Sequence, residues 1–248
     1  RVLSSTCTDF VRLFTLKILS EVTCMKNYPL LILFISLFFV TTANVAAQDT
    51  KTNTVENDIG INSVTKILLL GDSISASYGM KPKQGWVHLL NQKLIEQQQP
   101  YTIINASVSG ETTSGGLSRL SGILANENVD HLLIELGGND GLRGYSPKLI
   151  KNNLLQMVQL AQSKNIKVSM IKIKITPNYG PRYNKMFEQV FEDVAKSSNI
   201  NLLPFFMEAV VMDKNLMQAD GIHPNAQAQP IIADYVEQQL KTLMTTEH

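Results

Sequence analysis

Four short polar segments of the sequence carry side chains that could do chemistry together. Gly71-Asp72-Ser73 directly follows an apolar run, and Gly110 and Asn139 each come after a later one. The fourth segment, Asp220–Pro224, lies near the end of the chain. A serine hydroxyl becomes a nucleophile when an imidazole takes its proton, and a carboxylate can hold that imidazole in place. The segments therefore contain the residue types needed for serine-based nucleophilic catalysis.

The spacing of Asp220 and His223 is the most informative part of this set. Pro224 follows the histidine, and proline suits the first turn of a helix, so both side chains are predicted to share one turn just before a helix. In such a turn the carboxylate can accept a hydrogen bond from Nδ1–H and leave Nε2 free as a general base. The alternative is a surface histidine beside an aspartate that caps the helix.

The other three segments allow two interpretations each. Ser73 follows a buried strand closely enough to be a nucleophile at the sheet edge, but Asp72 or Ser73 could also cap the next helix. The phosphate-loop pattern and the G-x-S-x-G elbow are both missing. Gly110 can offer an unobstructed N–H and Asn139 a side-chain N–H to a developing negative charge, although both are also ordinary turn residues.

Alternating apolar runs and amphipathic stretches must position these groups. The predicted strands are 66–70, 101–105, 131–136, 167–175 and 201–203, and the predicted helices are 86–98, 147–164, 182–198 and 226–243. The strands are mostly continuous apolar runs, which is typical of parallel strands buried on both faces. This pattern predicts an α/β domain with a parallel sheet and helices on both faces, whose functional residues gather at the carboxyl ends of the strands. The glycine-rich run 112–122 is expected to be mobile.

Composition excludes several classes of protein. Apolar residues make up 44% of the chain and charged residues 17%, which excludes a disordered polyelectrolyte. The net charge of +1 gives no support to a nucleic-acid binder. The two cysteines, Cys7 and Cys24, both lie near the N-terminus, so a disulfide scaffold or a cysteine-based zinc site in the body of the chain is excluded.

The N-terminal region has the pattern of a secretory signal peptide. Met25-Lys26-Asn27 precedes the apolar run Pro29–Val40, and small residues up to Ala47 follow it. Residues 1–47 are therefore predicted to be an upstream extension plus a signal peptide that starts at Met25 and is cleaved near Ala47. Residues 48–62 are predicted to be a flexible leader and 63–248 the catalytic domain. We expect export to the periplasm of a Gram-negative bacterium, with secretion or an uncleaved anchor as alternatives.

The four segments, in this order and spacing, resemble the SGNH (GDSL) hydrolase family. The similarity extends from Lys66 to Leu243 and is greatest to exported bacterial enzymes with acyl thioesterase, arylesterase and lysophospholipase activity. The resemblance implies a three-layer α/β/α, flavodoxin-like fold with about five parallel strands. It implies that Ser73 is the nucleophile, His223 the general base and acid, and Asp220 the residue that orients His223. It also implies an oxyanion hole made by the N–H groups of Ser73 and Gly110 and the Asn139 side chain.

The resemblance further implies fatty acyl thioesters, aryl and alkyl esters and lysophospholipids as substrates, with no cofactor and no metal. We expect a monomer without a nucleic-acid partner. The candidate substrate-binding residues are Tyr179, Pro181, Phe206 and Met207, although Phe206 could instead close the core. Two other functions stay open: a metal-dependent phosphoesterase with Asp72, Asp220 and His223 as ligands, and a non-catalytic lipid-binding protein.

Overall fold

The computed structural model describes residues 64–246. The predicted signal peptide with its upstream extension, and the predicted leader over 48–62, lie outside the described residues, so their boundaries stay predictions. Within the described range, no helix combines the length and the apolar character that a membrane span requires.

Five parallel strands form a single sheet in the order β2-β1-β3-β4-β5. They are β1 (Thr65–Gly71), β2 (Tyr101–Asn105), β3 (His131–Glu135), β4 (Lys167–Ile171) and β5 (Asn201–Leu203). Leu69 of β1 stands beside Asn105 of β2 and Leu133 of β3, which places β1 between those two strands. The predicted parallel sheet of five strands is confirmed.

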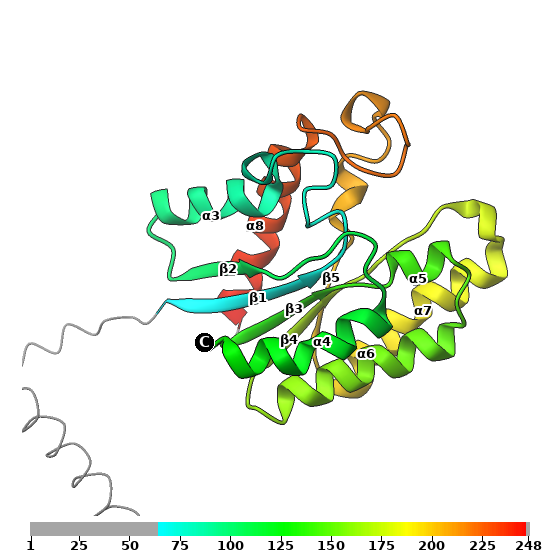
Figure 1. The fold of residues 1–248 in the computed structure, drawn as a ribbon, viewed down its shortest axis with the longest axis horizontal. Helices are drawn as coiled ribbons and strands as arrows, with labels where there is room; N and C mark the ends of the chain where they lie inside the picture. Colours follow the sequence, from blue (N-terminus) through cyan, green and yellow to red (C-terminus); the bar gives the residue numbers. More distant parts are fainter. Residues whose placement is uncertain (1–63, 247–248) are drawn as a thin grey trace, which may run out of the picture. The chain divides into compact units, whose positions relative to one another are not determined.

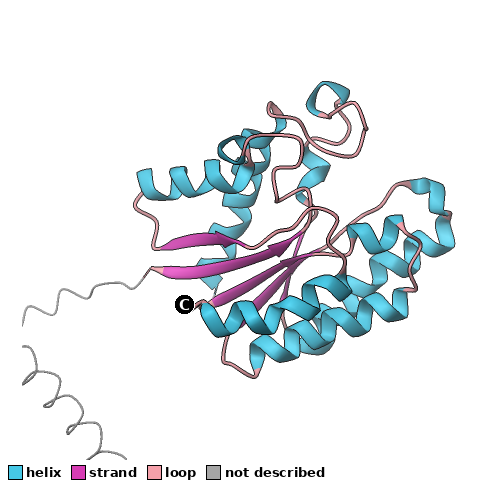
Figure 2. Ribbon diagram, in the orientation of Figure 1, coloured by secondary structure: helices cyan, strands magenta, loops and turns pink. Residues whose placement is uncertain are grey.

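Helices cover both faces of the sheet (Figures 1 and 2). The helices are α3 (Trp86–Glu96), α4 (Thr113–Asn126), α5 (Gly138–Leu142), α6 (Pro147–Gln162), α7 (Pro181–Ser198) and α8 (Ala228–Thr246). Figure 1 shows α3 and α8 together on one face and α4, α6 and α7 on the other. Between residues 64 and 246, short 3-10 helices lie in the loops at Pro82–Gln84, Pro177–Tyr179, Phe206–Ala209 and Lys214–Leu216. This arrangement confirms the predicted three-layer architecture.

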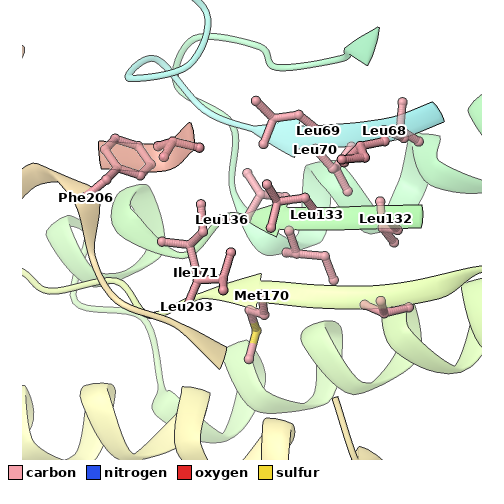
Figure 3. Close-up of a cluster of buried hydrophobic side chains, with 14 of the residues drawn as sticks. Leu68, Leu69, Leu70, Leu132, Leu133, Leu136, Met170, Ile171, Leu203 and Phe206 are labelled. Atoms are coloured by element: carbon pink, nitrogen blue, oxygen red, sulfur yellow. The ribbon is translucent and has the colours of Figure 1, made fainter. Parts of the chain in front are cut away.

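The apolar runs that predicted strands form the centre of the core. Leu68, Leu69 and Leu70 of β1 are fully buried, as are Leu132 and Leu133 of β3 (Figure 3). Successive side chains of a strand point to opposite faces, so a run that is buried at every position needs cover on both faces. The helices on the two faces provide that cover.

Helix α4 contains the glycine-rich run that was expected to be mobile. Thr112 caps this helix by accepting a hydrogen bond from the N–H of Gly115. A Cβ atom at Gly116 would lie 2.4 Å from Cδ1 of Leu136, so a larger residue would require the buried Leu136 side chain or the helix to shift. The glycine at this position therefore serves close packing of a helix on the sheet.

The order of the strands creates a crevice at the carboxyl ends of β1 and β3. The chain leaves β1 toward α3 on one face, and it leaves β3 toward α6 on the other. Because neighbouring strands then send their connections in opposite directions, the loops separate above the sheet edge. The segments around Ser73 and Asn139 are these two connections.

Candidate active site

A chain of hydrogen bonds connects Ser73, His223 and Asp220. Ser73 Oγ lies 2.9 Å from Nε2 of His223, although 150 residues separate the two in sequence. The other ring nitrogen of His223, Nδ1, lies 2.7 Å from Oδ2 of Asp220. Ser73 comes from the turn after β1, and the other two come from the loop that leads to α8. The sheet topology thus brings the three predicted residues to one place.

Asp220 organises its own turn as well as the imidazole. Its Oδ1 accepts hydrogen bonds from the backbone N–H groups of Ile222 at 2.9 Å and His223 at 3.0 Å. These bonds, led by the one from His223, lower the pKa of Asp220 to about 2. The carboxylate is therefore ionised at neutral pH, and an ionised carboxylate facing Nδ1 requires the proton on Nδ1. Nε2 is then the nitrogen that can accept the serine proton.

Two residues that the sequence did not point to hold the histidine loop in place. The ring of Tyr78 packs on the ring of His223, with centroids 4.3 Å apart. The side-chain Nε2 of Gln218 donates to the carbonyl oxygens of Tyr78 at 2.8 Å and Pro224 at 3.0 Å. Gln218 thereby ties the histidine loop to the segment after Ser73. Neither residue has a sequence pattern that would have identified it.

Two of the three predicted oxyanion donors lie at the same edge of the sheet, Gly110 in the loop after β2 and Asn139 in the first turn of α5. The side-chain Nδ2 of Asn139 donates a hydrogen bond of 3.2 Å to Oδ2 of Asp72, the residue before the predicted nucleophile. Gly110 has a φ angle of +78°, a conformation that favours glycine. Its carbonyl oxygen accepts a hydrogen bond of 3.3 Å from Nη2 of Arg143, just after α5. The arginine thus connects the Gly110 loop with the end of the Asn139 helix.

A buried carboxyl group, which the sequence analysis did not single out, lies beneath the nucleophile turn. Glu135 is the last residue of β3 and is 1% exposed. Its Oε2 accepts hydrogen bonds from the backbone N–H of Asp72 at 3.2 Å and from Oγ of Ser75 at 2.8 Å. Burial raises the pKa of Glu135 well above its ordinary value, and the nearby Asp72 raises it further. The signal that could have identified Glu135 is a carboxylate directly after the apolar residues 132–134 of a buried strand.

A pocket of about 590 Å³ lies against Ser73, Asn139 and His223. Most of its wall is apolar and includes Ile173, Ile175, Phe205, Met207, Val211 and Ile222. Two of the charged lining residues, Lys174 and Glu208, form an ion pair with each other. The wall beside the serine is therefore suited to an apolar group. Ser73, Asn139 and His223 present polar groups at one side of the pocket.

Of the four candidate substrate-binding residues, only Met207 lines this pocket. Phe206 is 1% exposed and packs on Trp86 with ring centroids 5.5 Å apart, so it belongs to the core. The hydroxyl of Tyr179 donates to the carbonyl oxygen of Leu142, and Pro181 begins α7 beside a separate polar hollow. Tyr179, Pro181 and Phe206 therefore lie outside the pocket lining, whereas Phe205, which the same segment of the sequence offers beside Phe206, is part of it.

The metal-dependent alternative requires Asp72, Asp220 and His223 to act together as ligands. Among residues 64–246, no three His, Cys, Asp or Glu side chains are grouped so that they could hold a metal ion. His223 Nδ1 is instead bonded to Asp220, and its Nε2 to Ser73.

Comparison with known proteins shows which family the chain belongs to. The GDSL-like Lipase/Acylhydrolase family matches residues 69–230, which include the end of the strand before Ser73 and the four polar segments from Gly71 to Pro224. The chain belongs to this family. The predicted resemblance to SGNH (GDSL) hydrolases is thereby confirmed, and the chain is an acylhydrolase.

Relatives of this acylhydrolase have names that describe ester hydrolysis. It is 45% identical to the arylesterase of Vibrio mimicus over 71% of this chain and 88% of the relative. It is 43% identical to thioesterase 1/protease 1/lysophospholipase L1 of Escherichia coli (strain K12) over 72% of this chain and 84% of the relative. The crystal structure of the psychrotrophic esterase EstA from Pseudoalteromonas sp., inhibited by monoethylphosphonate, matches with a TM-score of 0.72 and 43% identity, over 73% of this chain and 99% of that one.

Proposed function

We propose that this acylhydrolase cleaves acyl esters and thioesters through an acyl-enzyme on Ser73. The observation that carries the proposal is the 2.9 Å contact between Ser73 Oγ and His223 Nε2, with Asp220 bonded to the opposite ring nitrogen. Ser73 Oγ attacks the acyl carbonyl carbon while Nε2 takes the hydroxyl proton. The tetrahedral intermediate then collapses, the bond to the leaving oxygen or sulfur breaks, and His223 returns the proton to it.

Hydrolysis of the acyl-enzyme repeats these steps with water as the nucleophile. His223 takes a proton from the water, the hydroxide adds to the acyl carbon, and the proton returns to Ser73 as the acid leaves. In both halves negative charge develops on the carbonyl oxygen. We assign its stabilisation to the backbone N–H groups of Ser73 and Gly110 and to the side chain of Asn139.

The apolar pocket supports a fatty acyl group as the part of the substrate that it holds. Transfer of each methylene group from water into such a pocket contributes about 0.8 kcal/mol. The proposed substrates are fatty acyl thioesters, aryl and alkyl esters and lysophospholipids. A series of p-nitrophenyl esters and acyl-CoA thioesters of graded chain length tests this assignment. A fatty acyl ligand that binds without turnover would instead support the lipid-binding alternative.

Replacing Asn139 by alanine should lower kcat by a factor of about 10²–10³ and change KM little, because an oxyanion donor acts mainly in the transition state. The measurement is steady-state hydrolysis of a p-nitrophenyl ester. Asn126→Ala is the matched control, since this exposed side chain bonds only to its own helix at Gly122. An Asn139→Ala enzyme with full kcat would remove Asn139 from the mechanism.

Enlarging Ile175 to tryptophan should shorten the preferred acyl chain. Ile175 lines the pocket and is partly exposed, so the larger ring would occupy space that an acyl chain needs. Exclusion of two methylene groups should lower kcat/KM for a dodecanoyl ester about 10-fold relative to a butanoyl ester. Ile231→Trp on the exposed side of α8 is the control, because Ile231 is outside the pocket lining. Equal changes for both esters would argue against this pocket as the acyl site.

Export is a separate proposal that rests on the N-terminal pattern. The charged start, apolar run and small residues over 25–47 support a cleaved signal peptide and a periplasmic enzyme. Cell fractionation followed by N-terminal sequencing tests this proposal. A product that begins near Gln48 in the periplasmic fraction is expected, and a full-length product retained with the membrane would indicate an uncleaved anchor.

A further inference from the structure

We propose that Asp72 is a positioning residue that fixes the orientation of the Asn139 side-chain amide, and that Glu135 holds Asp72 in place for this task. The inference rests on the proposed function, because it assigns a purpose to Asp72 in the same reaction. Neither carboxyl group takes part in the proton transfers described above.

Asp72 joins the nucleophile turn to the start of α5. Its Oδ1 accepts a hydrogen bond of 3.1 Å from the backbone N–H of Ile74, and its Oδ2 accepts the bond of 3.2 Å from Nδ2 of Asn139. A Cβ atom at Gly138 would lie 3.1 Å from Oδ2 of Asp72, so the two segments approach each other closely. The carboxylate therefore connects the turn that carries the nucleophile with the first turn of α5, which carries the proposed oxyanion donor.

The chemistry of the two side chains explains why this bond matters. An amide can turn by 180° about its last bond and exchange its N–H₂ group with its carbonyl oxygen, which has nearly the same shape. An ionised carboxylate only accepts hydrogen bonds, so it selects the orientation in which Nδ2 faces Asp72. The second hydrogen on Nδ2 is then available for the substrate oxygen. The opposite orientation would present a carbonyl oxygen to a developing negative charge.

Burying the Asp72 carboxylate costs free energy, and this cost is not needed merely to accept a hydrogen bond from the N–H of Ile74. Asp72 is 4% exposed, and no Lys or Arg of the described residues forms an ion pair with it. Burial raises the pKa of Asp72 to about 6. The titratable groups that face it are His223, which favours the ionised form, and Asp140 and Glu135, which oppose it. A neutral side chain could have capped the turn without this cost.

Glu135 supports Asp72 from the sheet. It accepts hydrogen bonds from the backbone N–H of Asp72 and from the hydroxyl of Ser75, on either side of the nucleophile. A Cβ atom at Gly71 would lie 2.5 Å from Oε2 of Glu135, so only glycine leaves room for this carboxyl group. Two adjacent buried carboxyl groups do not both ionise readily. Because Glu135 is the more deeply buried of the two, Asp72 is the one that carries the charge at neutral pH.

A double-mutant cycle between Asp72 and Asn139 tests the proposal. In Asp72→Asn the amide oxygen can satisfy Ile74 or Asn139 but not both, so kcat should fall 10- to 100-fold with KM within about threefold of its original value. In an Asn139→Ala background the same change should lower kcat less than twofold. Glu237→Gln is the control, since it also converts a buried carboxylate into an amide but pairs with Lys93 and Lys241 outside the pocket. Its kcat should be unchanged.

Two outcomes of the cycle would overturn the proposal. One is an Asp72→Asn enzyme with unchanged kcat. The other is an equal loss of kcat when Asp72→Asn is made in the unaltered enzyme and in Asn139→Ala, which would mean that Asp72 does not act through Asn139. Ser73→Ala measured in parallel decides the proposed function separately, because it does not involve Asp72. Thermal unfolding shows which variants fold.

A second measurement uses the unaltered enzyme and so does not depend on folding of the Asp72 variant. The Asn139 side-chain amide resonance, assigned by its loss in Asn139→Ala, should show one hydrogen protected from solvent exchange and the other not. Two hydrogens that exchange equally fast would contradict a fixed amide.

Discussion

A Ser73→Ala enzyme should lose a factor of about 10⁴ or more in kcat, because no acyl-enzyme can form and only background catalysis by the rest of the site remains. The unaltered Oγ is 2.9 Å from Nε2 of His223, which places it within proton-transfer distance of its base. Steady-state hydrolysis of a p-nitrophenyl ester measures the effect. A serine-directed phosphonate should add its mass to the peptide containing Ser73 in the unaltered enzyme only.

The matched control for this experiment is Ser163→Ala. Ser163 is exposed after α6, and its hydroxyl bonds only to the carbonyl oxygen of Leu160. Its removal should leave kcat unchanged. More than a few per cent of the original kcat in Ser73→Ala would mean that the ester bond is broken without this nucleophile.

An Asp220→Asn enzyme should lose a factor of about 10³–10⁴ in kcat, although the shape of the side chain hardly changes. The asparagine oxygen can keep the backbone bonds to Ile222 and His223, which leaves its N–H₂ group facing Nδ1 of the imidazole. A donor at that place forces Nδ1 to accept and moves the ring proton to Nε2. Nε2 can then no longer take the proton of Ser73.

Asp213→Asn is the control for the aspartate, because Asp213 also caps a turn of the same loop by accepting from the N–H of Asn215. Its kcat should not change. If Asp220→Asn kept most of its kcat, the carboxylate would not determine the tautomer of His223.

The low pKa of Asp220 also determines how the difference in stability between the unaltered enzyme and Asp220→Asn depends on pH. A carboxyl group whose pKa is lower in the folded protein contributes stability above its unfolded value of 3.8, and this contribution is lost as the pH falls through about 2. Loss of activity on mild acidification therefore does not arise from Asp220. The difference in stability between the unaltered enzyme and Asp220→Asn should be constant above about pH 4 and shrink below it, as measured by urea unfolding.

Local signals in the sequence were sufficient for most elements of the fold. Apolar runs, most of them continuous, predicted the five strands of the sheet, with β3 and β4 shorter than predicted at their carboxyl ends. Proline identified the start of α6, and the observed end of that helix is two residues before the predicted one. Helix α4 was missed because its glycines favour a flexible run by composition. The run is helical in the structure, and Gly116 allows this helix to lie close to Leu136, a neighbour 20 residues away that no local pattern reveals.

By itself the sequence determined the parallel sheet, the family and the Asp220–His223 turn, since each depends on neighbours within a few residues or on ordered motifs. Only the tertiary structure decided what surrounds these groups. It placed Phe205 on the pocket and Phe206 on Trp86, and it set Glu135 under the nucleophile turn. The physical reason is that burial, pKa and the direction of a side chain depend on atoms from distant strands and loops, and their proximity exists only after the chain has folded.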